Sequence, residues 1–257
     1  MLNKGDDELE EVELKTMQSK RVALCVTCLV DQVVPEVGVA TVQLLRRAGY
    51  DVDFPEAQTC CGQPFFNSGF RDQAVDLAKR TIEIFEPFDA VVLPSGSCAS
   101  MIRVEYPHLL EESHEWHRRA AELAEKTYEL SEFLVNYAGW SPEGDFEEVK
   151  LTYHDSCHMC RLLGVSDEPR QMLERVGGRI SEMSESDRCC GFGGLFSVRM
   201  PEVSNAMTGE KLRQACDVGV ETLVTSDPGC LTQMRGLADG SSIKVEHIAT
   251  VLEEMTR

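Results

Sequence analysis

The chain has 257 residues, a mass of 28.7 kDa and a formal net charge of −19, from 25 basic and 44 acidic side chains. Its 42% hydrophobic and 27% charged residues are globular values, and the length suits one large domain or two small ones. So acidic a surface repels nucleic acid, and no apolar run is long enough to cross a membrane. We therefore expect no nucleic-acid partner and no membrane span.

Eleven cysteines need a chemical explanation in a chain of this kind. Residues 1–20 are acidic and polar, without the apolar stretch of a secretory signal, and are predicted to form a disordered tail. We therefore expect a cytoplasmic protein. Disulfides do not persist in that reducing compartment, where thiol clusters usually bind metal or perform catalysis.

From residue 21 onward, short apolar segments alternate with helical patterns. Strands are predicted at 21–24, 50–54 and 90–93, and helices at 35–48 and around 75–85. Such alternation is typical of a parallel sheet with helices packed on its faces, and ligands of these folds bind at the carboxyl ends of the strands.

The same rhythm restarts after residue 144. Strands are predicted at 150–153, 179–183 and 222–225, with a helix at 202–215. We therefore predict an α/β fold of two tandem, pseudo-symmetric repeats, spanning 21–143 and 144–257 and docked about a pseudo-twofold axis.

The cysteines follow this repeat. A shift of 129 residues relates four pairs of positions, which are Cys28 and Cys157, Cys60 and Cys189, Cys61 and Cys190, and Gly62 and Gly191. Cys98 and Cys230 differ by 132, which requires only a three-residue insertion. Each half thus carries four thiols, each placed after a predicted strand.

Four convergent thiolates suit either an iron–sulfur cluster or a tetrahedral zinc ion. Zinc sites typically use Cys-x2-4-Cys pairs, whereas each half here has two adjacent cysteines, which a wider cluster accommodates better. We therefore favour two iron–sulfur clusters of the [4Fe–4S] type. The predicted ligands are Cys28, Cys60, Cys61 and Cys98 in the first half, and Cys157, Cys189, Cys190 and Cys230 in the second.

Glycines follow both cysteine pairs and are candidate cofactor-binding residues. Backbone N–H groups at Gly62, Gly191, Gly193 and Gly194 could point at an anionic cluster. The alternative is that they only form tight turns with positive φ.

Three cysteines fall outside the two quartets. Cys25 and Cys160 are interpreted as spare thiols or packing residues, with a role as alternative ligands left open, and Cys216 as a small buried hydrophobe on a helix. His154, Asp155 and His158 flank the predicted ligand Cys157. They are interpreted as a satisfied polar turn, with proton transfer or hydrogen bonding to a cluster as the alternative.

Five ordered motifs carry a resemblance to a known family. They are CLVDQ at 28–32, TCCGQP at 59–64, PSGSC at 94–98, YHDSCH at 153–158 and CCGFGG at 189–194. Together they resemble the lactate utilization protein A group of the CCG-domain, cysteine-rich iron–sulfur proteins. More distant members include the cysteine-rich subunit of heterodisulfide reductase and the iron–sulfur subunit of glycolate oxidase.

The resemblance implies a role in a cytoplasmic complex that oxidises L-lactate to pyruvate. The implied partners are a ferredoxin-like iron–sulfur protein and a third subunit, with this chain as an electron-transfer subunit. The wider pattern often ends each half with Cys-x-x-Cys, but Cys98 and Cys230 lack the second thiol. This departure argues against the disulfide-cleaving chemistry of heterodisulfide reductases.

Two other functions remain open on the residues alone. A zinc-stapled scaffold would use the same thiols to hold an α/β module, and a thiol/disulfide reductase would use the vicinal cysteines directly. No G-x-G-x-x-G dinucleotide fingerprint or P-loop occurs. A hydride acceptor is therefore expected on a companion subunit or at a site shared between subunits.

Overall fold

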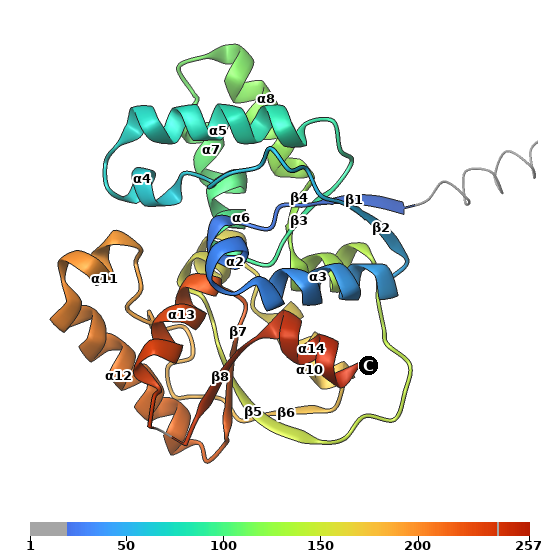
Figure 1. Cartoon of the computed structure of the whole chain (residues 1–257), viewed down its shortest axis with the longest axis vertical. Coiled ribbons are helices and arrows are strands. Elements are labelled where there is room, and N and C mark those ends of the chain that lie inside the picture. The colour runs from blue at the N-terminus through green and yellow to red at the C-terminus, as the bar shows by residue number, and fades with distance from the viewer. Residues whose placement is uncertain (1–19, 241) are drawn as a thin grey trace, which may run out of the picture.

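The computed structural model describes residues 20–240 and 242–257, so all but the last residue of the predicted tail lies outside the described residues. Two four-stranded parallel sheets form the fold, with strand orders β2-β1-β3-β4 and β6-β5-β7-β8 (Figure 1). The two orders are equivalent, and helices flank both sheets. The predicted α/β fold of two tandem repeats is confirmed.

Each repeat begins with its central strand. The first sheet consists of β1 (Lys20–Leu24), β2 (Tyr50–Asp53), β3 (Val91–Leu93) and β4 (Thr127–Glu129). The second consists of β5 (Val149–His154), β6 (Gly178–Ile180), β7 (Thr222–Thr225) and β8 (Lys244–His247). The short edge strands β4 and β8 were not predicted, and β6 ends at residue 180, short of the predicted 183.

The helices of the first repeat are α2 (Cys28–Val33), α3 (Pro35–Arg47), α4 (Gln63–Asn67), α5 (Arg71–Phe85), α6 (Gly96–Ser100), α7 (Tyr106–Leu109), α8 (His114–Glu125) and α9 (Leu130–Glu132). Those of the second are α10 (Asp167–Arg175), α11 (Leu195–Arg199), α12 (Pro201–Asp217), α13 (Pro228–Leu237) and α14 (Ile248–Met255). The described residues also contain three short π-helices, η1 (Met101–Glu105), η2 (Phe133–Tyr137) and η3 (Met159–Leu163). No helix among the described residues is long and apolar enough to traverse a bilayer.

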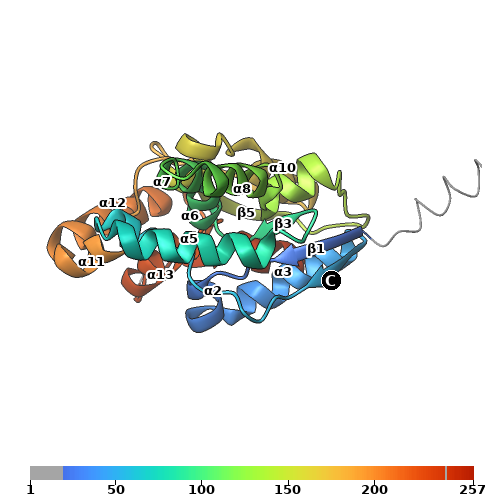
Figure 2. The same cartoon turned by 90° about the horizontal axis from the view of Figure 1, so that it is seen from above.

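Helices cover both faces of the first sheet, so its central strand β3 is apolar throughout. All three residues of β3 are buried, as expected for a strand between two layers. Helix α3 covers one face with Val37, Ala40 and Leu44, which follow the helical period. Helices α5 and α8 cover the other face, away from the second repeat (Figures 1 and 2).

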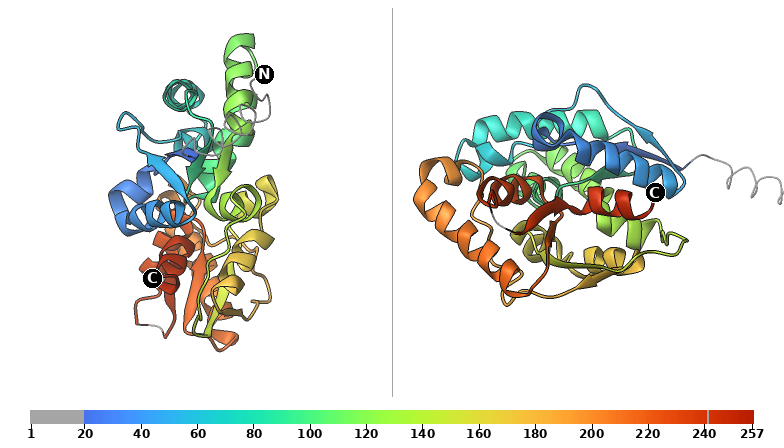
Figure 3. Two further views of the ribbon diagram at one scale, coloured as in Figure 1. Left: turned by 90° about the vertical axis from the view of Figure 1, so that its right-hand side faces the viewer. Right: turned by 60° about the horizontal axis from the view of Figure 1, so that its bottom comes forward.

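The two repeats meet through reciprocal contacts. Helix α3 packs against α14, while its counterpart α10 packs against α9 and η2 (Figure 3). In the same way α2 contacts α13, and η3 contacts α6. Such exchange of equivalent surfaces is the mark of a twofold interface. One apolar cluster therefore runs through both repeats, with Leu24 and Leu44 from the first and Leu151 and Leu252 from the second.

A buried carboxylate joins the first turns of α6 and α13 at this interface. Asp227 caps its own helix by accepting hydrogen bonds from the backbone N–H groups of Gly229 and Cys230 at 3.0 and 3.3 Å. Its second oxygen accepts the Ser97 N–H of the first repeat at 2.8 Å. Ser95 is the equivalent cap of α6 and accepts the Cys98 N–H at 3.3 Å. The first turns of α6 and α13 therefore each contain a predicted ligand and are each capped by a side chain. Both also take part in the contact between the repeats.

Substitutions of Asp227 should separate these two roles. Asp227→Ser keeps a capping oxygen but loses the bond to Ser97, at an expected cost of about 1.5–3 kcal/mol for a charged hydrogen bond. Asp227→Ala loses the cap as well, about 0.5–2 kcal/mol more. Urea denaturation measures both. Equal stability of the two variants would contradict the capping role, and a serine variant as stable as the wild type would contradict the bond between repeats.

Candidate functional site

The structure places the predicted ligands of each repeat after three neighbouring strands. In the first repeat, Cys28 begins α2 after β1, Cys60 and Cys61 lie in the loop after β2, and Cys98 lies in α6 after β3. Because β1 is hydrogen-bonded to both β2 and β3, these three strand ends share one edge of the sheet. All eleven cysteines are free thiols.

The four sulfurs of the first repeat form a connected group. Cys28 donates a hydrogen bond to the Cys60 sulfur, and so does Cys61. These two bonds, the Cys28 bond foremost, lower the pKa of Cys60 to about 3. The sulfurs of Cys61 and Cys98 lie 3.3 Å apart. In this group of four, the neighbouring thiols therefore favour the thiolate form of Cys60.

The second repeat reproduces this arrangement. Cys157 and Cys190 hydrogen-bond to Cys189 and lower its pKa to about 2, with Cys157 as the larger cause. The sulfurs of Cys190 and Cys230 lie 3.1 Å apart. The structure therefore brings all eight predicted ligands together, in two separate quartets.

The predicted glycines shape the cysteine loops. Gly62, Gly191, Gly193 and Gly194 all have positive φ, between 51° and 93°. The N–H groups of Gly62 and Gly191 each point at the sulfur two residues earlier, 3.4 Å away. Turn formation and N–H donation toward sulfur, which the sequence left as alternatives, therefore coincide at these two positions.

Side chains that the sequence analysis did not single out hold the loops in place. The carbonyl of Cys61 accepts a hydrogen bond from the Tyr106 hydroxyl, and that of Cys190 from Thr208, both at 2.7 Å. Ser204 donates to the Gly191 carbonyl, also at 2.7 Å. Ser204 and Thr208 lie one turn apart on the buried face of α12, and polar residues on a buried helical face are the signal that could have revealed them.

Thr27, immediately before Cys28, has a strained backbone. Its φ of 71° and ψ of 151° belong to a region that is essentially restricted to glycine, and no other non-glycine residue among the described ones has positive φ. Such a conformation costs about 1–3 kcal/mol and is concentrated at functional sites. The buried Thr27 hydroxyl has no hydrogen-bond partner.

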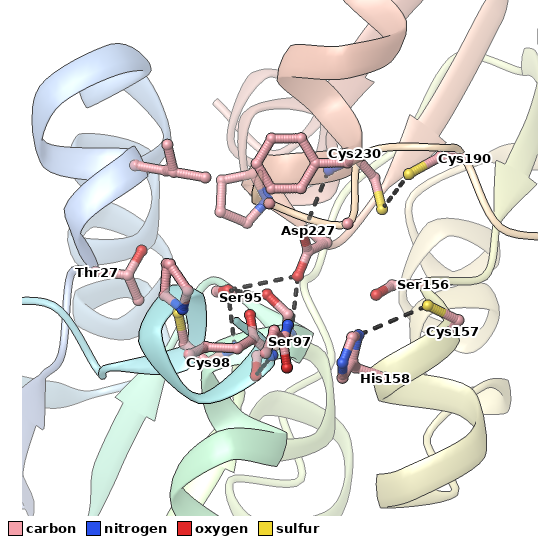
Figure 4. A pocket seen from close by; sticks show the side chains of 18 of the residues that line it. Thr27, Ser95, Ser97, Cys98, Ser156, Cys157, His158, Cys190, Asp227 and Cys230 are labelled. Carbon is pink, nitrogen blue, oxygen red and sulfur yellow. Dashed lines mark hydrogen bonds between the residues drawn. The ribbon is translucent and has the colours of Figure 1, made fainter. Parts of the chain in front are cut away.

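A cavity of about 270 Å³ lies between the repeats and touches both quartets. Cys98 lines it from one side, and Cys157, Cys190 and Cys230 from the other, with Asp227 between them (Figure 4). Cys61, Gly193 and Gly194 also line it. The two quartets thus share one interior space.

The other cysteines differ in their surroundings. Cys25 is buried, Cys160 is half-buried and Cys216 is exposed. The prediction that Cys216 is a buried hydrophobe is wrong, because the buried side of α12 carries Leu212 and Ala215 and the next residue turns to solvent.

The polar residues around Cys157 are only partly satisfied. Burial opposes ionisation of Asp155, but the Arg170 guanidinium, bound at 2.8 Å through two nitrogens, holds the pKa of Asp155 below its usual value. His158 Nδ1 lies 3.6 Å from the Cys157 sulfur. His154 uses Nδ1 to bind the Ser186 carbonyl at 3.2 Å, whereas its Nε2 is buried without a partner.

The donor set fits a metal group in each repeat. Four sulfurs converge from three loops, the pKa of one of them is lowered by its neighbours, and a backbone N–H group points toward that sulfur. Thiolates are ligands of both iron–sulfur clusters and zinc. These features indicate metal binding, and the donor atoms alone do not select the metal.

Comparison with known proteins gives the family. The family model for the CCG cysteine-rich domain matches residues 22–103 and 151–235, one segment in each repeat. Lactate utilization protein A of Bacillus subtilis is 48% identical over 235 residues, covering 90% of this chain and 98% of that one. The chain belongs to this family. The Geobacillus kaustophilus and Halalkalibacterium halodurans proteins of the same name are 47% and 45% identical, over 90% and 92% of this chain and 98% of theirs.

Among solved structures, a hypothetical protein from Helicobacter pylori is similar in fold. It superposes with a TM-score of 0.68 at 8% sequence identity, covering 100% of this chain and 55% of that chain. At this identity the likeness extends to the fold alone.

Glycine-to-alanine substitutions should show that, of the two cysteine loops in this chain, the second tolerates an added methyl group less well. In Gly191→Ala the left-handed backbone costs about 1–2 kcal/mol, and the new methyl group would lie 2.5 Å from the Ser204 carbonyl oxygen. Gly62→Ala has the same backbone cost, but its nearest contacts are Leu77 Cβ at 3.3 Å and the Ala74 carbonyl oxygen at 3.5 Å, so it should be less destabilising.

Chemical denaturation of both variants tests this order. Gly209→Ala, on the exposed side of α12 with open space around it, is the control and should not destabilise the protein. A Gly191→Ala protein as stable as the Gly209→Ala protein would contradict the packing described here.

Proposed function

We propose that this chain is an iron–sulfur electron-transfer subunit of a cytoplasmic complex that oxidises L-lactate to pyruvate. Cys28, Cys60, Cys61 and Cys98 would hold one [4Fe–4S] cluster, and Cys157, Cys189, Cys190 and Cys230 the other. The observation that carries the proposal is the pair of thiol quartets at one cavity. The name of the relatives, lactate utilization protein A, supports the choice of substrate.

The number of sites matches the chemistry. Conversion of L-lactate to pyruvate removes two electrons and two protons, with one hydrogen lost from the hydroxyl-bearing carbon and one from its hydroxyl group. Bound clusters would supply reversible one-electron transfer, so two of them can together accept the pair. The chain's own residues would hold the clusters and direct backbone N–H groups at their sulfur ligands. The two clusters would lie on either side of the buried cavity between the repeats.

Companion subunits complete the proposed system. A ferredoxin-like iron–sulfur protein and a third subunit would join this chain, as the family resemblance implies. The sequence lacks a dinucleotide fingerprint, so a hydride acceptor would reside on a companion or at a shared surface. The cavity that both quartets line would connect the two sites in such a relay.

Metal analysis after anaerobic purification tests the cofactor. Two [4Fe–4S] clusters require about eight irons and about eight acid-labile sulfides per chain. About two zinc ions and a colourless protein would instead identify a zinc-stapled scaffold. Full activity of the reconstituted complex with iron-free protein would identify a thiol-based reductase and overturn the proposal.

Single substitutions test the assignment to two sites. Cys60→Ser and Cys189→Ser should each remove about half of the iron, because each removes a ligand from only one quartet. The remaining cluster should keep its own redox signal. Cys216→Ser is the matched control, since that thiol is exposed and belongs to neither quartet, and should retain all of the iron. Unchanged iron in either ligand variant would refute the assignment for that repeat.

A further inference from the structure

The second repeat contains a histidine directed at its cysteine quartet. His154 is the last residue of β5 and is fully buried. One ring nitrogen of His154 and the sulfurs of Cys190 and Cys230 all lie within 4.8 Å of one another. The histidine therefore adds a buried nitrogen beside two sulfurs of the quartet.

The hydrogen bonds of the ring define which nitrogen is free to bind a metal. Nδ1 lies 3.2 Å from the Ser186 carbonyl, and because a carbonyl can only accept, Nδ1 carries the proton. The Lys211 ammonium donates to the same carbonyl at 3.2 Å, so the proton on Nδ1 and the ammonium share this acceptor. In the neutral ring, Nε2 then presents a lone pair.

That lone pair has no donor. Nε2 is buried and unpartnered, which is rare for an interior polar atom. The neighbouring sulfurs of Cys190 and Cys230 cannot donate once they are thiolates bound to metal. A metal ion is the partner that satisfies a buried imidazole lone pair among thiolates, and a proton fixed on the opposite ring nitrogen by a carbonyl is the usual arrangement of a ligating histidine.

We propose that His154 binds one iron of the second cluster through Nε2, beside Cys190 and Cys230, in place of one of the four thiolates of that quartet. This inference rests on the proposed function, because it requires a cluster in that quartet. The first repeat has no equivalent nitrogen, since the position 129 residues earlier is Cys25, a buried thiol. The two centres are therefore chemically different, although their cysteines repeat in register.

The difference should be visible in the reduction potentials. Replacement of thiolate by neutral imidazole ligation raises the potential of an iron–sulfur centre, because the ligand brings no negative charge. The second cluster should therefore be reduced before the first. His154→Gln, which keeps a polar side chain but offers no imidazole, should lower the potential of the second cluster and leave that of the first unchanged.

Pulsed EPR with isotope labelling tests the ligand directly. The holoprotein, grown with 15N-labelled histidine and reduced, should show a strongly coupled nitrogen whose signal changes from the 14N to the 15N pattern. The coupling should disappear in His154→Gln and persist in His158→Gln, which changes the neighbouring histidine near Cys157. Should His154→Gln fail to fold, labelled Cys189→Ser protein provides the second test, because loss of the second cluster should remove the coupling.

The outcomes separate this inference from the proposed function. Absence of iron and sulfide in anaerobic wild-type protein overturns the proposed function, and the histidine ligand with it. Two clusters without any histidine coupling overturn the ligand alone. A coupling that survives in His154→Gln, or that is lost in His158→Gln, also excludes His154 as the ligand.

Discussion

The first turns of α6 and α13 meet at the centre of the molecule, and both quartets depend on this contact. Each turn contributes a cysteine, Cys98 or Cys230, whose backbone N–H is bound by a helix cap. Asp227 serves its own helix and also accepts the Ser97 N–H from the other repeat. A shift of one helix would move its own cysteine and, through Asp227, the other helix with its cysteine. The positions of the two quartets are therefore linked.

The remaining sulfurs are placed by the parallel sheets. Strands that run in the same direction end at the same edge, so loops distant in sequence converge there without long connections. Hydroxyl donors from Tyr106 and Thr208 then fix the cysteine loops through their carbonyls. Different side chains perform this task in the two repeats, which shows that the loop position is retained while its supports have diverged.

Much of this arrangement could be predicted from the sequence. The repeat of cysteines at a shift of 129 residues, together with apolar segments before each of them, indicated two equivalent sites at strand ends. The edge strand β4 was missed because three residues give no usable periodicity. The bond from Ser97 to Asp227 joins residues 130 positions apart and depends on how the repeats dock, which no local pattern encodes. Cys216 was misplaced because the boundary of a buried helical stripe depends on the neighbouring elements.

Asp227 also explains why a tandem chain can do what two identical subunits cannot. In a symmetric pair, every substitution at the axis occurs twice, so a carboxylate there would face its own copy and both would resist ionisation. Covalent fusion removes that restriction, and here the axis carries one aspartate opposite one serine, Ser95. The single negative charge satisfies N–H groups from both sides without a repelling twin. Two like halves can thereby differ at the axis that they share.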